Sequence, residues 1–154
     1  MYYIAVFFVS WIWWYLKADK TRLREMFGAV VFTMFLGLLT DLIMVHYKLW
    51  DYEGLPEPIY TIPLLLDYSV YPVVAYLFAQ NLPETWGDIL KRTLIWTGFA
   101  ICFEWITLKT GHMEHHQWWN LWLSLAADIL IFLSMAAIFR YYRTAYLRSE
   151  SNPG

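Results

Sequence analysis

The segment WWNLWLSLAAD, residues 118 to 128, sets polar side chains into an otherwise apolar run. Asn120, Ser124 and Asp128 recur at every fourth residue, so a helix places all three on one face. A carboxylate within an apolar helix needs a partner, because burying an unpaired charge is costly. This segment therefore predicts a helix whose polar face packs against other helices.

Asp41, Asp67 and Glu104 interrupt three other apolar runs. The chain is 60% hydrophobic and 21% aromatic, and only 16% of its residues are charged, which is too apolar for an ordinary soluble domain. Its formal net charge is -2, whereas nucleic-acid binding needs a concentrated positive surface. We expect an integral membrane protein that resides in a lipid bilayer and has no nucleic-acid partner.

Five apolar segments are candidates for membrane-spanning helices. They cover approximately residues 1–16, 26–47, 60–80, 89–108 and 118–139. The first would extend about 24 Å, short of a hydrocarbon core of about 30 Å, and terminal Tyr and Trp side chains can make up the difference at the interfaces. It lacks the features of a removable signal peptide, so we expect it to remain in the mature protein.

Basic residues predict the orientation of these segments. The loop KADKTRLRE carries four basic and two acidic residues, and three arginines follow the last segment. Because positive loops face the cytoplasm, we predict an all-α, five-helix transmembrane bundle with an outside N-terminus and a cytoplasmic C-terminus. The predicted location is the cell membrane, with residues 1–148 as one domain and 149–154 as a disordered tail.

Two segments carry further packing information. Ala29, Thr33, Gly37 and Asp41 fall at four-residue intervals, as expected for a helix-packing face. Pro72 lies inside the third segment, and proline within a helix frees backbone carbonyls and favours a kink.

In this topology the acidic residues share one layer. Asp41, Asp67 and Glu104 each lie about 10 Å below the outer surface at the helical rise per residue. The predicted ligand- or cation-binding site consists of the polar residues in or next to this layer: Asp41, Asp67, Glu104, Asn120, Ser124 and Asp128. Since no lysine or arginine lies at that depth, the carboxyl groups must be protonated, hydrogen-bonded or bound to a cation.

The histidines suggest a different site. All four lie at the predicted outer side and form the candidate metal set: His46, His112, His115 and His116. Imidazole and carboxylate together are common ligands of Zn²⁺ and other divalent ions, which makes a divalent metal the candidate cofactor. The sequence HMEHH does not have the HExxH spacing, and a solvated histidine loop is the alternative interpretation.

The stretches EWITLKTG (104–111), WNLWLSLAAD (119–128) and LWDYE (49–53) together resemble a family of small multi-pass membrane proteins of spore-forming Bacillota. The resemblance extends over most of the chain. It implies an integral membrane protein and supplies no activity, because that family is uncharacterised. The positions that match its pattern are Asp41, Trp50, Glu104, Trp119, Asn120, Trp122, Ser124 and Asp128.

Three functions stay open at this point. The leading hypothesis is an outward-facing carboxylate site that binds or conducts a proton, a cation or a polar lipid headgroup. The first alternative is a membrane-embedded, metal-dependent hydrolase or transferase acting on lipid. The second is an accessory subunit whose polar stripes pair with another membrane protein or a second copy of the chain. In a structural interpretation, the same groups only hydrogen-bond the helices together.

Overall fold

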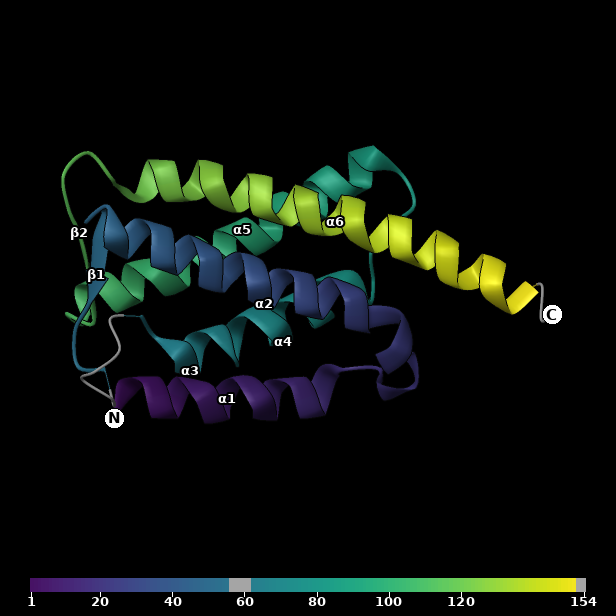
Figure 1. The fold of residues 1–154 in the computed structure, drawn as a ribbon, viewed down its shortest axis with the longest axis horizontal. Coiled ribbons are helices and arrows are strands. Elements are labelled where there is room, and N and C mark those ends of the chain that lie inside the picture. Colours follow the sequence, from purple (N-terminus) through teal and green to yellow (C-terminus); the bar gives the residue numbers. More distant parts are fainter. Residues whose placement is uncertain (56–61, 152–154) are drawn as a thin grey trace.

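The computed structural model describes residues 1–55 and 62–151, with side-chain surroundings described as far as Thr144. The elements in chain order are α1 (Tyr2–Lys17), the short 3-10 helix η1 (Lys20–Arg22), α2 (Leu23–His46), β1 (Trp50–Tyr52), α3 (Leu64–Asp67), α4 (Val70–Ala79), α5 (Trp86–Lys109), β2 (Met113–His115) and α6 (Leu121–Ser151). The fold is mostly helical, which confirms the all-α class (Figure 1).

The helices run side by side as a bundle (Figure 1). α4 contacts α1, α2 and α6, while α5 packs mainly against α6. Seven of the ten α4 residues are buried, so this short helix forms the centre of the bundle. The largest apolar cluster surrounds the second half of α4 and includes Met26, Phe78, Ile89, Phe132 and Phe139.

The third predicted segment is interrupted, and Pro72 accounts for the break. α3 ends at Asp67 and α4 begins at Val70. Proline has no N–H to donate to the carbonyl of Tyr68, and its ring crowds that carbonyl. Backbone bonding resumes where the Val73 N–H donates to the Ser69 carbonyl at 3.1 Å. The predicted kink is therefore a break between two helices, and Asp67 lies beside it.

β1 and β2 form an antiparallel pair that joins two loops at one end of the bundle (Figure 1). Trp50 faces His115 across the pair, Asp51 faces Glu114, and Tyr52 faces Met113. No strand was predicted in either connection. Three-residue strands are too short to give a periodic signal, and only their pairing reveals them.

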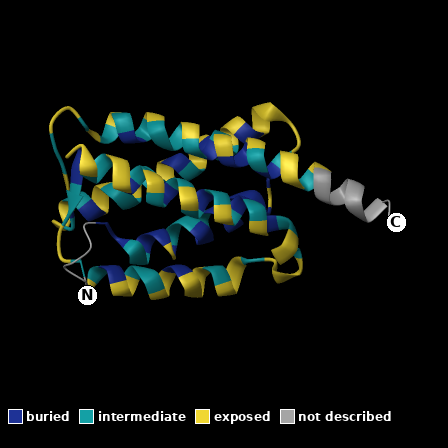
Figure 2. Cartoon of the chain, viewed as in Figure 1, coloured by how far each residue is buried: buried dark blue, intermediate teal, exposed yellow. Residues whose placement is uncertain are grey.

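Exposed positions run along the outer faces of the helices (Figure 2), and many of them carry large apolar side chains. Large apolar side chains are exposed along α1, α2 and α5, among them Phe8, Ile12, Phe35, Ile95 and Phe99. Conversely, several polar side chains are buried, namely Ser10, Thr33, Asp41, Asp67, Ser69, Gln80, Thr93, Thr97, Thr107 and Ser124. Soluble proteins show the reverse tendency, burying apolar groups and exposing polar ones.

Within the described residues, two helical stretches are long and apolar enough to cross a membrane, Lys20–His46 and Leu121–Thr144. Length and composition alone are weak evidence, because the core helix of a soluble protein can pass the same test. Here 22% of each apolar window is buried inside the protein. These two helices weakly suggest that the chain associates with a membrane, and five crossings stay a prediction.

The observed ends of the segments differ modestly from the predicted ones. α2 and α5 each begin about three residues before their predicted spans, and α6 extends well beyond 139 to Ser151. Positions 149–151 of the predicted disordered tail continue α6, and positions 152–154 lie outside the described residues. The predicted start of the third segment near residue 60 also lies outside them.

Candidate functional site

Asp41 reaches the bundle interior from the packing face of α2. Ala29, Thr33, Gly37 and Asp41 are all buried, which confirms the face predicted from their spacing. The Asp41 side chain has no exposed surface. Tyr52 donates to its Oδ1 over 2.7 Å, and the Tyr71 hydroxyl lies 3.5 Å from its Oδ2.

Two local features place these tyrosines. Gly37 leaves room for Tyr71, since a Cβ atom at position 37 would lie 2.7 Å from the Tyr71 ring. Tyr52 enters from β1, and burial raises the pKa of Tyr52 well above its usual value. Its hydroxyl therefore stays protonated and remains a donor to Asp41.

Asp67 lies beside Asp41 at the end of α3. It is 1% exposed, and among the described residues neither carboxyl oxygen meets a hydrogen-bond donor apart from the Asp41 carboxyl group, which can donate only when the pair holds a proton. Asp41 and Asp67 are electrostatic neighbours. None of the ion pairs among the described residues involves either of them. The two carboxyl groups therefore face each other without a basic side chain to neutralise them.

Glu104 and Ser124 form a second group, contributed by α5, β2 and α6. Ser124 donates to Glu104 Oε1 over 2.6 Å, and His115 Nε2 lies 2.8 Å from the same oxygen. The indole N–H of Trp119 donates to Ser124 Oγ over 2.9 Å. Unlike Asp67, Glu104 thus has two polar neighbours, both at Oε1.

The two groups meet around Tyr71 and Trp50. Tyr71 lies within electrostatic range of four acidic residues, Asp41, Asp67, Glu104 and Asp128. Trp50, which faces His115 across the strands, packs its ring edge-on to Trp119 with centroids 5.4 Å apart. Five of the six residues in the predicted carboxylate site thus lie in one region of the bundle.

Asn120 is the exception. Its side chain is exposed, and its Oδ1 accepts from the backbone N–H groups of Trp122 and Leu123 at the start of α6. Asparagine at this position caps the helix by satisfying free N–H groups. The four-residue spacing did place Ser124 and Asp128 correctly, but it could not separate a capping residue from a site residue.

The four histidines do not gather into one metal site. His46 packs against Tyr47, His112 stacks on Tyr2, and His115 contacts Glu104. Among the described residues, His116 is the one histidine that belongs to a group of three potential ligands: its ring nitrogen and the carboxylates of Asp51 and Glu114 lie within 4.8 Å of one another. The histidine cluster in the sequence is divided because successive residues of a strand point to opposite faces.

Tyr52 and Tyr71 are the site residues that the sequence did not reveal. Tyrosine near the ends of apolar segments is typical of membrane interfaces, so neither residue stood out. The available signal for a bulky neighbour was Gly37, which lies one helical turn before Asp41. A glycine in a helix-packing face leaves room for a large side chain from another helix.

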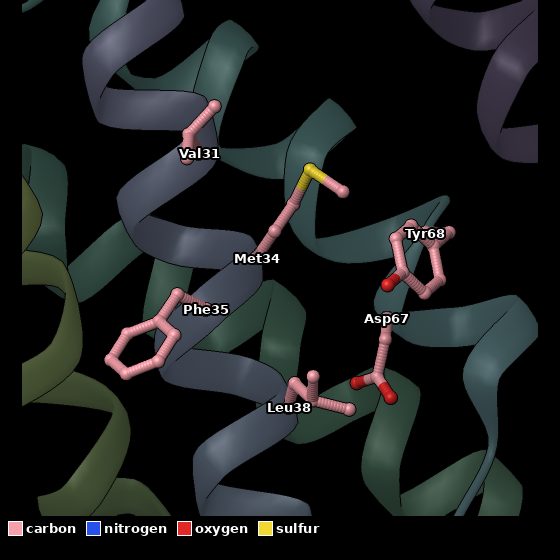
Figure 3. Close-up of a pocket in the computed structure, with 6 residues that line it drawn as sticks. All are labelled: Val31, Met34, Phe35, Leu38, Asp67 and Tyr68. Carbon is pink, nitrogen blue, oxygen red and sulfur yellow. The ribbon is translucent and has the colours of Figure 1, made fainter.

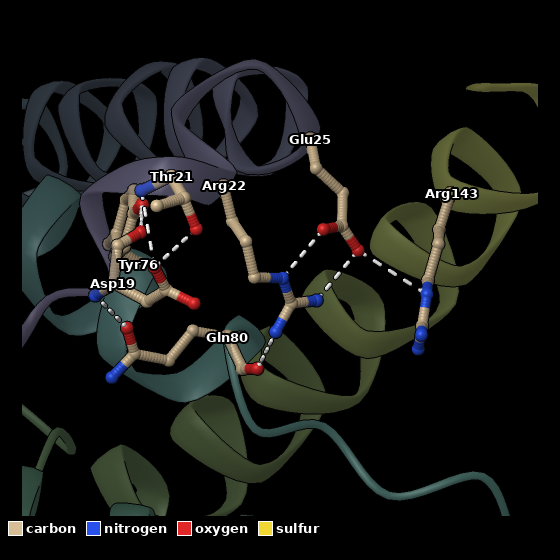
Figure 4. Close-up of polar contacts among 7 residues, drawn as sticks. All are labelled: Asp19, Thr21, Arg22, Glu25, Tyr76, Gln80 and Arg143. Atoms are coloured by element: carbon tan, nitrogen blue, oxygen red, sulfur yellow. Dashed lines mark hydrogen bonds and ion pairs between the residues drawn. The ribbon is translucent and has the colours of Figure 1, made fainter. Parts of the chain in front are cut away.

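A contrasting polar network (Figure 4) lies around the start of α2, at the end of the bundle away from β1 and β2 (Figure 1). Arg22 donates two hydrogen bonds to the Glu25 carboxylate, over 2.6 and 2.7 Å, and a third to the Gln80 carbonyl. Arg143 Nε lies 3.3 Å from Glu25. The Gln80 amide accepts from the Asp19 N–H and donates to the Lys17 carbonyl. We call this set the arginine network.

Comparison with protein-family models, curated proteins and solved structures found no match for this chain.

Proposed function

We propose that this chain is a five-span membrane protein that binds and releases a proton at the Asp41–Asp67 pair. Membrane insertion is supported by the apolar outer surface and the buried polar side chains. In a bilayer these apolar side chains contact lipid acyl chains instead of water, so their exposure on the protein surface carries no hydrophobic cost. The basic residues around the α1–α2 connection favour a cytoplasmic position for that end and an outer position for β1 and β2.

The observation that carries the proposal is the unpartnered carboxyl group of Asp67 beside buried Asp41. Two adjacent carboxylates cannot both be charged at low cost, so such a pair shares a proton. Asp41 has tyrosine donors that favour its anionic form, which makes Asp67 the proton carrier. Helix interruptions beside buried carboxyl groups are also a recurring feature of transport sites in membranes.

Proton exchange can be measured with the purified protein in liposomes that contain a trapped pH-sensitive dye. A potassium gradient with valinomycin supplies the driving potential. We expect the wild type to change the internal pH, and Asp41→Asn and Asp67→Asn to lose most of that flux. Asp88→Asn is the matched control, because Asp88 is exposed at the opposite end of the bundle. Wild-type flux in Asp67→Asn would refute the assignment.

Glu104 is a weaker candidate for the exchanging group. Its carboxylate already accepts from Ser124 and contacts His115, so its oxygen Oε1 has the partners that Asp67 lacks. Glu104→Gln in the same assay should retain the fold and part of the flux. A complete loss in this variant, with flux preserved in Asp67→Asn, would transfer the role to Glu104.

A second candidate function is divalent-cation binding at the strand pair. Asp51 and Glu114 face each other directly across β1 and β2, where like charges destabilise the pairing. His116 lies 3.0 Å from Asp51 and completes a set of three potential ligands. A divalent ion would neutralise the two carboxylates, and these ligand types suit Zn²⁺.

Elemental analysis of protein purified without chelator and without a metal-affinity tag tests this candidate. Near-stoichiometric metal in the wild type that is lost in His116→Ala would support it. His112→Ala is the control, because His112 stacks on Tyr2 outside the three-residue set. Metal-free wild type, also after incubation with Zn²⁺, would exclude the site and the metal-dependent lipid hydrolase that needs it.

A further inference from the structure

Positive charge gathers at the end of the bundle that holds the arginine network. The segments at this end, 17–25, 80–92 and 140–143, contain eight basic and four acidic residues (Figure 1). The segments at the other end, 46–55 and 109–117, contain two basic residues, three acidic residues and the four histidines. An anion is therefore attracted to the end with the arginine network.

Arg140 carries a charge at this end that no acidic side chain neutralises among the described residues. Its guanidinium group lies 5.1 Å from the centre of the Trp86 ring. Within the described part of the chain, Nη1 is the one nitrogen of this group that is buried without a hydrogen-bond partner. Arg140 as a whole is only half-buried, so an anion can approach the other nitrogens, Nε and Nη2.

Arg143 adds a second positive charge three residues further along α6. Its side chain is 40% exposed, and its Nε lies 3.3 Å from Glu25 Oε1. Glu25 already accepts two hydrogen bonds from Arg22, so a single carboxylate is shared by two arginines. Residues three apart are neighbours on a helix surface, and the unshared charge therefore lies next to Arg140.

Trp86 begins an exposed apolar strip on α5. Leu90 and Leu94 follow it at four-residue intervals, so the three side chains share one helix face. Their exposed fractions are 55%, 46% and 52%. Asp88 lies on a different face, because it is only two positions from Trp86, and it pairs with Lys91 over 2.9 Å. A polar group at Arg140 would thus connect to an apolar path along α5.

We propose that an anionic phospholipid binds here, with its phosphate group at Arg140 and Arg143 and an acyl chain along Leu90 and Leu94. The inference rests on the membrane insertion in the proposed function and goes beyond the carboxyl pair to a second site. Guanidinium groups suit phosphate oxygens in charge and hydrogen-bond geometry. Tryptophan is typical of the headgroup level, and clusters of basic residues there attract anionic lipids.

Charge selects an anionic lipid over a zwitterionic one. The phosphate group of phosphatidylcholine is neutralised by its own ammonium group, whereas phosphatidylglycerol keeps a net negative charge. The surplus of arginine over carboxylate at this site therefore favours phosphatidylglycerol.

The apolar groove between α2 and the α3–α4 break does not offer the headgroup a second site (Figure 3). The Asp67 carboxyl oxygens are buried beneath its surface. The described residues that line it include no basic side chain: Val31, Met34, Phe35, Leu38, Asp67 and Tyr68.

Native mass spectrometry of the full-length protein in mild detergent measures the lipids that stay bound. Palmitoyl-oleoyl phosphatidylglycerol is titrated as the anionic probe and the corresponding phosphatidylcholine as the zwitterionic one. Arg140→Gln removes the proposed phosphate contact. Lys109→Gln removes one positive charge from the opposite end, and Lys17→Gln removes one at the same end from α1, which lies away from α6 in Figure 1.

We expect the wild type to bind phosphatidylglycerol more tightly than phosphatidylcholine. The dissociation constant for phosphatidylglycerol should rise about fivefold in Arg140→Gln, the scale for one basic residue at a membrane surface. Both lysine variants should bind it like the wild type. Equal affinity of the wild type for the two lipids, unchanged binding in Arg140→Gln, or an equal loss in Lys17→Gln would overturn the site.

A photoreactive phosphatidylglycerol with a diazirine in its acyl chain locates the lipid on the wild-type protein, so the assignment does not depend on the folding of a variant. We expect the labelled peptides to come from the first turns of α5, around Leu90 and Leu94. Labelling confined to α1 would contradict the proposed position.

Proton flux separates this inference from the proposed function. Arg140→Gln leaves Asp41 and Asp67 in place, so we expect it to keep proton exchange, and Asp67→Asn should keep lipid binding. Arg140-dependent lipid binding in a wild type without flux would refute proton exchange alone. Flux without Arg140-dependent lipid binding would refute the lipid site alone.

Discussion

At one end of the bundle, Arg22 donates three hydrogen bonds to Glu25 and Gln80. At the other end, within the part of the chain that the structure describes, Asp67 has no partner besides a second acid, Asp41. Both ends place polar groups among apolar helices. The arginine network neutralises its acidic member, Glu25, with two arginines. The Asp41–Asp67 pair has no such neutralisation.

The difference indicates distinct roles for the two ends. Satisfied polar networks stabilise and orient helices, while an unsatisfied buried group costs free energy. An unsatisfied buried group that lowers stability in this way is expected where the group has a functional role. The arginine network thus holds one end of the helices together, and we propose that the Asp41–Asp67 pair at the other end is kept for proton exchange.

The largest expected loss of stability comes from breaking the arginine network with Arg22→Ala. The substitution leaves Glu25 with only the longer contact to Arg143 and removes a donor from the Gln80 carbonyl. We expect a loss of about 2 kcal/mol, the scale for hydrogen bonds to charged groups that are partly buried. Thermal unfolding in detergent measures it.

Arg24→Ala is the matched control for that substitution, since Arg24 is exposed on the same turn of α2. It should unfold close to the wild type. If both substitutions lowered the stability equally, the loss would come from removing one positive charge, and the hydrogen bonds of the arginine network would contribute nothing.

The next effect concerns the packing that brings Tyr71 to Asp41. Gly37→Ala places a Cβ atom 2.7 Å from the Tyr71 ring, so either the ring or α4 must shift. Overpacking of this kind costs about 1–3 kcal/mol, and displacement of Tyr71 should also reduce proton flux. Thermal unfolding and the liposome assay measure the two consequences.

Gly98→Ala on α5 is the control for added volume, because no atom lies within 4 Å of the new Cβ position. It should be neutral or slightly stabilising, as alanine favours a helix over glycine. If Gly37→Ala behaves the same way, close packing of Tyr71 against α2 is not required.

Asp67→Asn should raise the stability of the protein, whereas Arg22→Ala and Gly37→Ala should lower it. The asparagine side chain has the same size and removes the cost of protonating, on folding, an acid that is charged in the unfolded chain, so we expect a gain of up to about 1 kcal/mol together with the loss of proton flux. Unfolding temperature and flux should be measured on the same preparation. A variant that is clearly less stable than the wild type would show that Asp67 has a structural role.

The smallest effect is expected at Asp19, outside the helices. Hydrogen bonding from Thr21 lowers the pKa of the Asp19 carboxyl group. Its contribution to stability is therefore present above the usual aspartate pKa and is lost as the pH falls through the folded-state value. Asp19→Asn should unfold slightly earlier than the wild type at neutral pH and equally in acid. A difference that persists in acid would contradict this charge effect.

Much of the fold followed from the sequence, because long apolar runs and proline positions carry strong local signals. Part of the site followed as well: the shared layer of Asp41, Asp67, Glu104 and Ser124 required only helical rise and direction. Helix rotation and the β1–β2 pairing did not follow, since they depend on contacts between distant segments. Without those contacts, the sequence did not show that Tyr52 and Tyr71 reach Asp41. It also did not show that the four histidines of the predicted metal set lie apart.

The most direct test of the central claim is infrared spectroscopy of the purified protein in lipid, comparing wild type with Asp67→Asn in water and in heavy water. A protonated carboxylic acid has a carbonyl-stretch band distinct from that of a carboxylate, and the band shifts on deuteration. We predict one such band in the wild type at neutral pH that is absent from Asp67→Asn. The same bands in both proteins would contradict a proton held on Asp67.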